Sequence, residues 1–284
     1  MPNPTAAILI IGDEILSGRT RDANMHHLAG ELTKVGIDLH EVRIVSDVRG
    51  AIVAAVNALR AAFDHVFTSG GIGPTHDDIT ADAVAAAFGV PIDVRDDARA
   101  VLAAHYVRSG VEMNAARLRM ARVPDGAVLI DNPVSGAPGF SLGNVHVMAG
   151  VPNIFQAMVA SLLPTLTGGA PVASRTLRVM RGEGTIAEPL GALAAEFGDL
   201  SFGSYPFVKD GAFGTNLVVR GSDAVRLIPH IDLAVIREKL FVSVLSDCLD
   251  AVGVMDQAMP SRIRPLDEGL VMAGRARTAA FMEV

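Results

Sequence analysis

The chain reads Thr68-Ser-Gly-Gly-Ile-Gly-Pro-Thr-His-Asp-Asp-Ile-Thr80 between an apolar run at 65–67 and a helical pattern at 81–88. Glycines at this turn let the backbone bend sharply and approach a ligand, while backbone N–H groups and a helix N-terminus favour an anion. Asp77 and Asp78 would repel a phosphate, but a divalent cation such as Mg²⁺ can bridge carboxylates and phosphate. The stretch therefore predicts a metal-assisted phosphate or pyrophosphate site.

A structural interpretation of the same stretch stays open. Gly-rich turns between a strand and a helix occur in α/β proteins that bind no ligand. Asp78 could cap the following helix, and Asp77 could favour the helix dipole. His76 could donate to a phosphate oxygen or act as a general acid, or it could be an exposed loop histidine.

Apolar strands and amphipathic helices alternate on both sides of this loop. Strands are expected at 6–11, 39–45 and 65–68, and helices at 22–35, 48–63 and 80–88. This alternation predicts a three-layer α/β/α fold around a mostly parallel sheet. Later in the chain we expect helices at 96–109, 113–120 and about 153–163, a strand at 128–130, and a hairpin whose strands 140–142 and 145–148 flank Gly143-Asn144.

A second, smaller α+β unit is expected after a Pro-, Gly- and Thr-rich linker at 163–174. It would contain strands at 176–180, 200–206 and 217–220 and a helix at 186–197. The expected organisation is 1–168 for the large α/β domain, 175–228 for the small domain and 231–284 for a tail.

Composition excludes several classes of protein. The formal net charge is −7 and no basic run is present, which argues against a general nucleic-acid binder. Cys248 is the single cysteine, so no intrachain disulfide framework is possible, as is usual in a reducing cytosol. The apolar run at 6–11 is too short to span a bilayer, and no signal peptide is recognisable. We expect a cytoplasmic protein without a membrane partner.

Carboxylates follow each of the first three expected strands. Asp13 and Glu14 follow the first, Asp47 follows the second, and Asp77 and Asp78 follow the third. Ligands of open parallel sheets bind beyond the carboxyl ends of the strands, where these acids would converge. The alternative is that Asp is common in loops as a turn former or cap, and Asp47 before the 48–63 helix fits that interpretation.

The whole loop resembles the Gly-Gly-x-Gly-Pro-Thr-x-Asp-Asp-x-Thr signature of the molybdopterin-binding domain family, in its competence/damage-inducible protein A branch. Gly12-Asp13-Glu14-Ile15-Leu16-Ser17-Gly18 resembles the opening motif of that family, and the resemblance covers about residues 5–225. In similar pterin-adenylating enzymes, the acids that match Asp47 and Asp78 work with Mg²⁺ on the pyrophosphate of a pterin–AMP intermediate. Relatives form dimers or trimers, so the resemblance implies a homodimer or homotrimer.

The loop, the strand ends and the resemblance together give a set of candidate site residues. The catalytic candidates are Asp47 and Asp78, and the metal ligands would be Asp47, Asp77 and Asp78. The candidates for binding substrate or phosphate are Gly12, Asp13, Glu14, Asn24, Ser69, Gly70, Gly71, Gly73, Pro74, Thr75, Gly139, Gly150 and Pro152. The metal would be Mg²⁺, or Mn²⁺ or Co²⁺ in its place, and the ligand a molybdopterin or a nucleotide.

The chain departs from the family pattern at the far wall of the expected pocket. Ala149 stands where the family often has proline, and Ile154 where it often has glutamate. Arg19 and Arg21 could neutralise phosphate charge near the first strand end, although solvated arginines are the alternative. Segment 231–284 resembles the opening part of the regulator of ribonuclease activity A family, which includes class II pyruvate aldolases, without its active-site loop. Aldolase activity is therefore not expected.

Three functions remain open at this stage. The first is a metal-dependent pyrophosphatase that hydrolyses a nucleoside diphosphate sugar of the ADP-ribose type. The second is adenylyl transfer to molybdopterin, in the biosynthesis of the molybdenum cofactor. The third is a pterin- or nucleotide-binding module without catalysis, which would suit the altered Ala149 and Ile154. The fold alone cannot choose between them.

Overall fold

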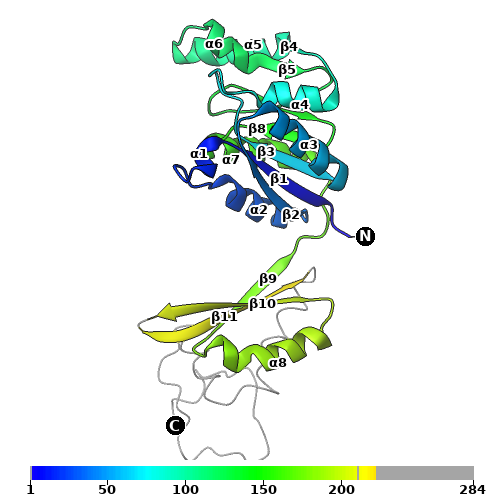
Figure 1. The fold of residues 1–284 in the computed structure, drawn as a ribbon, viewed down its shortest axis with the longest axis vertical. Coiled ribbons are helices and arrows are strands. Elements are labelled where there is room, and N and C mark those ends of the chain that lie inside the picture. Colours follow the sequence, from blue (N-terminus) through cyan, green and yellow to red (C-terminus); the bar gives the residue numbers. More distant parts are fainter. Residues whose placement is uncertain (1, 210, 222–284) are drawn as a thin grey trace, which may run out of the picture. The chain divides into compact units, whose positions relative to one another are not determined.

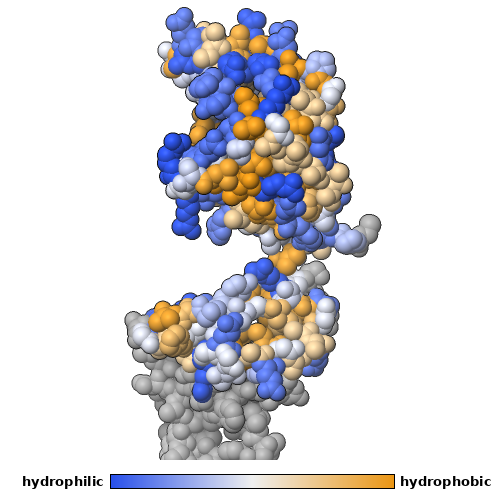
Figure 2. All heavy atoms as spheres, viewed as in Figure 1, coloured by the Kyte–Doolittle hydropathy of each residue, from blue (hydrophilic) through white to orange (hydrophobic). Residues whose placement is uncertain are grey.

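The computed structural model describes residues 2–209 and 211–221. They divide into two compact units, of which the first ends at Pro171 and the second begins at Val172. The segment expected at 231–284, with Cys248, lies outside the described residues, so its resemblance to the aldolase family is not shown. None of the described helices is long and apolar enough to cross a bilayer. Hydrophilic residues cover much of the visible face of the first unit, with apolar areas between them (Figure 2).

The first unit is built on a mostly parallel sheet, as expected from the alternation of strands and helices. Its strand order is β2-β1-β3-β8-β7-β6. Figure 1 labels the four parallel strands β2, β1, β3 and β8. The bounds are β1 Thr5–Ile11, β2 Asp38–Val45, β3 His65–Ser69, β6 Val128–Ile130, β7 Gly139–Leu142 and β8 Val145–Met148. The first three strands and β8 run parallel, whereas β6 and β7 pair antiparallel at one edge. The predicted fold class is confirmed.

Helices cover both faces of this sheet, so the central strand β1 is buried on both sides. Ala7, Leu9 and Ile11 belong to one apolar cluster with α3 (Arg49–Ala62) and α4 (Thr80–Phe88). Ala6, Ile8 and Ile10 belong to the other, with α2 (Asn24–Lys34) and α7 (Pro152–Leu162). A continuous apolar run such as this is typical of a central parallel strand between two helical layers.

Shorter elements complete the unit. They are α1 (Asp13–Leu16), β4 (Ile92–Val94), α5 (Asp96–Ser109), α6 (Ala115–Leu118), the 3₁₀ turns η1 (Arg119–Ala121) and η2 (Leu163–Thr165), and β5 (Arg122–Pro124). The helix expected at 113–120 is in fact α6 followed by η1. Asn114 caps α6 by accepting the Arg117 N–H, which fixes the late start of the helix. The expected hairpin is confirmed, with Gly143 at φ 56° in its two-residue turn.

The second unit is a small antiparallel sheet with one helix. Its strand order is β10-β11-β9, with bounds β9 Ala173–Val179, β10 Ser201–Lys209 and β11 Ala212–Gly221. Helix α8 (Glu183–Glu196) buries Ile186 and Leu193, each beside residues of the sheet such as Leu217 and Val219. A small α+β unit was expected here, although β9 begins three residues earlier and α8 begins before 186.

A polar cluster lies inside the first unit, on neighbouring strands β3, β8 and β7. His146 is only 4% exposed, and one ring nitrogen lies 3.2 Å from His65 Nδ1. Its other ring nitrogen lies 2.8 Å from the Ser141 hydroxyl oxygen. Burial and, as a smaller cause, the neighbouring His65 together lower the pKa of His146 to about 3. Burial also lowers the pKa of His65. Both imidazoles are therefore neutral in the folded protein near neutral pH.

We expect the first unit to lose stability in mild acid because of this cluster. The pKa of each histidine is lower in the folded state than in the unfolded state, so protonation favours unfolding. The folded state is therefore most stable above the ordinary pKa of 6.5, and it loses stability as the pH falls towards 3. His146 alone should lower the free energy of unfolding by about 2 kcal/mol between pH 7 and pH 5. Urea unfolding followed by circular dichroism at both pH values measures this. His146→Phe should remove most of the pH dependence, and an unchanged dependence would contradict the assignment.

Candidate functional site

The Gly-rich loop leaves β3 through two residues that only glycine can occupy without strain. Gly70 has φ 110° and Gly71 has φ 69°. A Cβ atom on Gly70 would lie 2.2 Å from the Ile11 carbonyl oxygen, and one on Gly71 would lie 2.1 Å from Thr80 Oγ1. The Thr80 hydroxyl in turn donates to the Gly70 carbonyl oxygen at 3.0 Å. The loop is thus folded tightly over the end of β1 and onto the first residue of α4.

Asp78 is held within this loop rather than at the helix. Its Oδ2 accepts the Thr75 N–H at 2.8 Å and the Thr75 hydroxyl at 2.5 Å. The residue at the N-cap position of α4 is Ile79, and no side chain caps that helix. The interpretation of Asp78 as a helix cap is therefore wrong. Gly73 lies directly against it, because a Cβ there would come 2.6 Å from Asp78 Oδ2.

Asp47 links the ends of β2 and β1. One carboxylate oxygen accepts the Asp13 N–H at 2.9 Å, at the start of the short helix α1. The alternative interpretation of Asp47 as a cap of α3 is not supported, since no side chain caps that helix. Burial raises the pKa of Asp47, and the negative charges of Asp13, Glu14 and Asp77 raise it further. The structure therefore brings acids from three strand ends close enough to repel one another.

Asn24 connects helix α2 to two other parts of the site. It is 3% exposed, and its Nδ2 donates to Ser69 Oγ at 2.8 Å and to the Gly150 carbonyl oxygen at 2.7 Å. These bonds fix the ends of β3 and β8 relative to α2. Its Oδ1 is buried and has no hydrogen-bond partner among the described residues.

A cavity of about 610 Å³ lies over these strand ends. Its walls include many of the candidate residues, namely Gly12, Glu14, Asp47, Gly70, Gly71, Gly73, Pro74, Thr75, Asp77, Asp78, Gly150 and Pro152. Ala149 and Ile154, the two departures from the family pattern, also line it. Asp13, Asn24, Ser69 and Gly139 do not. Gly139 packs on β8 instead, where a Cβ would lie 2.4 Å from the Val147 carbonyl oxygen.

The charged side chains that line this cavity, in the part of the chain that the structure describes, are all carboxylates. They belong to Glu14, Asp47, Asp77 and Asp78. No group of three or more His, Cys, Asp or Glu side chains within 2–209 and 211–221 is compact enough to hold a metal ion alone. Mg²⁺ commonly takes one or two carboxylates and completes its shell with water and substrate phosphates. The residues present fit a metal that binds together with a phosphate ligand.

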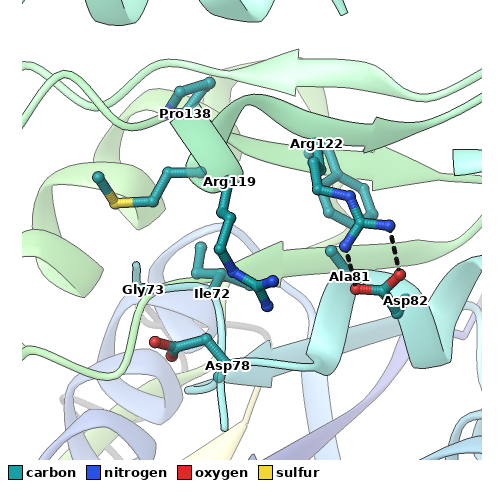
Figure 3. Close-up of a pocket in the computed structure, with 11 residues that line it drawn as sticks. Ile72, Gly73, Asp78, Ala81, Asp82, Arg119, Arg122 and Pro138 are labelled. Carbon is teal, nitrogen blue, oxygen red and sulfur yellow. Dashed lines mark hydrogen bonds and ion pairs between the residues drawn. The ribbon is translucent and has the colours of Figure 1, made fainter. Parts of the chain in front are cut away.

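Some residues of the site were not identified from the sequence. Tyr106 and Met120 line the cavity, and Arg119 lines a smaller pocket beside Gly71, Gly73 and Asp78. Figure 3 shows the Arg119 side chain reaching towards Asp78. No sequence motif identifies Arg119. The only signal in the sequence is the excess of carboxylates at the expected site, because an anionic ligand would need a positive charge there. Arg19 and Arg21, the sequence candidates for that cation, are exposed and do not line the cavity, and His76 is exposed too.

Both units match families of known proteins. Residues 7–168, which contain the whole site, match a family described as "Probable molybdopterin binding domain", and residues 171–228 match "FAD synthase, middle domain". A "Probable FAD synthase" of Caenorhabditis elegans is 33% identical over 241 residues, which are 76% of this chain and 46% of that protein. A "CinA-like protein" of Desulfosudis oleivorans is 35% identical over 209 residues, covering 70% of this chain and 51% of that protein. The chain thus spans about half the length of these two relatives.

A solved structure agrees with these matches. The crystal structure of the protein CinA from Thermoplasma acidophilum, described as having unknown function, is 31% identical and superposes with a TM-score of 0.52. The superposition covers 57% of this chain and 97% of that one.

Proposed function

The chain belongs to the probable molybdopterin binding domain family through residues 7–168, and from this premise we propose that it is a metal-dependent pyrophosphatase. Its substrate would be a nucleoside diphosphate sugar such as ADP-ribose. The observation that carries the proposal is the cavity of about 610 Å³, in which glycine backbone faces Glu14, Asp47, Asp77 and Asp78. Cavities of this size hold ligands as large as a nucleotide.

The reaction would be hydrolysis of the pyrophosphate link. A water oxygen forms a new bond to one phosphorus, the bond from that phosphorus to the bridging oxygen breaks, and the water protons pass to solvent. The products from ADP-ribose are AMP and ribose 5-phosphate. A divalent metal bound with the substrate would neutralise charge that develops on the phosphate oxygens.

The glycines and the aspartates of the site would have different roles in this reaction. Gly70, Gly71 and Gly73 give the phosphates a close backbone approach. Asp78 keeps a fixed orientation because Thr75 holds one of its oxygens, so its other oxygen, Oδ1, is available to a metal or an attacking water. Asp47 is placed likewise, with one oxygen on the Asp13 N–H. Fixed carboxylates of this kind stabilise a transition state without reorganising during the reaction.

Adenylyl transfer to molybdopterin is the second candidate, favoured by the description of the matched family. It would use the same carboxylates and metal, with a pterin phosphate in place of the attacking water. A binding module without catalysis is the third, favoured by apolar Ala149 and Ile154 in the cavity wall.

One assay separates these candidates. The purified chain is incubated with ADP-ribose, and separately with ATP and molybdopterin, in the presence of Mg²⁺, Mn²⁺ or Co²⁺ and with EDTA as control. AMP released from ADP-ribose only when metal is present supports the pyrophosphatase. Adenylylated pterin without ADP-ribose hydrolysis would replace it with the transferase. Ligand binding without turnover in any condition would leave the non-catalytic module.

A further inference from the structure

The cavity lacks the positive charge that a pyrophosphate requires. Its charged walls, within the described residues, are the four carboxylates Glu14, Asp47, Asp77 and Asp78. A single divalent metal would not balance these together with the charges of a bound pyrophosphate. Sites that bind phosphates usually add an arginine or lysine, and arginine matches phosphate oxygens with its planar fork of N–H groups.

A smaller pocket of about 20 Å³ adjoins the cavity and contains two arginines. The two spaces share Gly71, Ile72, Gly73, Asp78 and Met120, so the Gly-rich loop and one methionine line both of them. The pocket is large enough for about one water molecule. A single phosphate oxygen has a similar size, whereas a base or a sugar would not enter.

Arg119 and Arg122 lie at the starts of η1 and β5, and both side chains reach towards α4 and its loop (Figure 3). Arg122 has a structural role, because its guanidinium donates to both carboxylate oxygens of Asp82 at 2.7 Å each. Both carboxylate oxygens of Asp82 thus accept a hydrogen bond from Arg122, so Asp82 is not the partner of Arg119.

Arg119 has no such partner. Its Nε is buried and makes no hydrogen bond to any described residue, and no ion pair within the described part of the chain involves it. A buried guanidinium N–H without an acceptor is unfavourable, so folded proteins seldom retain one without a reason. The side chain points towards Asp78, whose Oδ2 already accepts two hydrogen bonds from Thr75.

We propose that Arg119 is the phosphate-binding cation of this site, which contacts one oxygen of a pyrophosphate that lies across the Gly-rich loop. This inference rests on the proposed function for the identity of the whole substrate, but it requires only that the site bind a pyrophosphate group. Arg119 supplies on one side of Asp78 the positive charge that the metal supplies on the other. It thereby favours ligands that carry phosphate over uncharged pterins or nucleosides.

Binding of inorganic pyrophosphate tests the proposal. Isothermal titration calorimetry with Mg²⁺ compares the full chain with Arg119→Met, Arg119→Lys and Arg99→Met. Arg99 lies on α5, is exposed and lines neither pocket, so its replacement removes the same charge elsewhere. We expect Kd to rise about tenfold or more in Arg119→Met and less in Arg119→Lys, which keeps the charge but loses the fork. The Arg99→Met variant should bind within about twofold of the unaltered protein.

The outcomes distinguish this inference from the proposed function. Equal affinity of Arg119→Met and the unaltered protein would overturn the inference, as would failure of the unaltered protein to bind pyrophosphate. Pyrophosphate binding that depends on Arg119, without ADP-ribose hydrolysis, would support the inference and remove only the pyrophosphatase. If Arg119→Met does not fold, as judged by circular dichroism, Arg119→Lys decides: a Kd raised about threefold or more supports the proposal, and an unchanged Kd contradicts it.

Discussion

Replacement of Asp78 by asparagine is expected to lower the kcat of ADP-ribose hydrolysis about 100-fold or more while the chain stays folded. Asparagine keeps an oxygen that can accept the two Thr75 hydrogen bonds, so the loop retains its shape. It removes the negative charge next to the metal and the attacking water, and the loss of one fixed electrostatic contact commonly costs about 10²–10³ in rate. The rate of AMP formation at saturating substrate measures this.

Asp96→Asn is the matched control for Asp78→Asn. Asp96 is exposed at the start of α5 and lines none of the pockets described above, so the variant loses the same charge away from the site. Its kcat should stay within about twofold of the unaltered protein. If Asp78→Asn turned over as fast as Asp96→Asn, the carboxylate would have no part in the chemistry, and a non-catalytic role for the loop would be the better account.

Gly70→Ala is expected to lower the free energy of unfolding of the first unit by about 3 kcal/mol. An L-residue at φ 110° is strained, and its Cβ would lie 2.2 Å from the Ile11 carbonyl oxygen. The loop cannot move aside freely, because Gly70 N–H donates to the Met148 carbonyl oxygen and Gly150 lies against it. The backbone shift needed should also weaken pyrophosphate binding. Urea unfolding followed by circular dichroism measures the stability.

Gly30→Ala is the matched control for Gly70→Ala. Gly30 lies inside α2 and a Cβ there would meet nothing within 4 Å. Alanine in a helix interior should raise the free energy of unfolding by about 0.5–1 kcal/mol, because glycine has the larger backbone entropy in the unfolded state. A Gly70→Ala variant as stable as the unaltered protein would mean that the loop does not have the constrained geometry described here.

Local sequence signals were sufficient for the fold because the main elements are long and consistently patterned. The buried run of β1 and the apolar stripe of α3 identify a central strand and a covering helix without any long-range information. Strand-end acids could be placed near one another for the same reason, since parallel strands end at a common edge. The short strands β4 and β5 pair only with each other, outside the main sheet, and the sequence analysis does not predict them.

The parts of the site that depend on long-range contacts could not be predicted. Asp78 stands just before a helix, where a cap is the natural expectation, and only the folded loop shows that Thr75 binds it. Asp47 precedes α3 but accepts the Asp13 N–H at the start of α1, because β1 and β2 lie side by side. Arg119 is separated from the Gly-rich loop by some forty residues, and its approach depends on how β5, which follows η1 directly, docks against α4.

The destination of the oxygen atom from water is the most direct test of the central claim. The full chain is incubated with ADP-ribose and Mg²⁺ in ¹⁸O-labelled water, and the masses of the products are measured by mass spectrometry. Metal-dependent hydrolysis at phosphorus should give AMP and ribose 5-phosphate in equal amounts, with one ¹⁸O atom incorporated into one of the two phosphates, and no products when EDTA is present. Intact ADP-ribose, or products whose phosphates carry no label, would contradict hydrolysis at phosphorus.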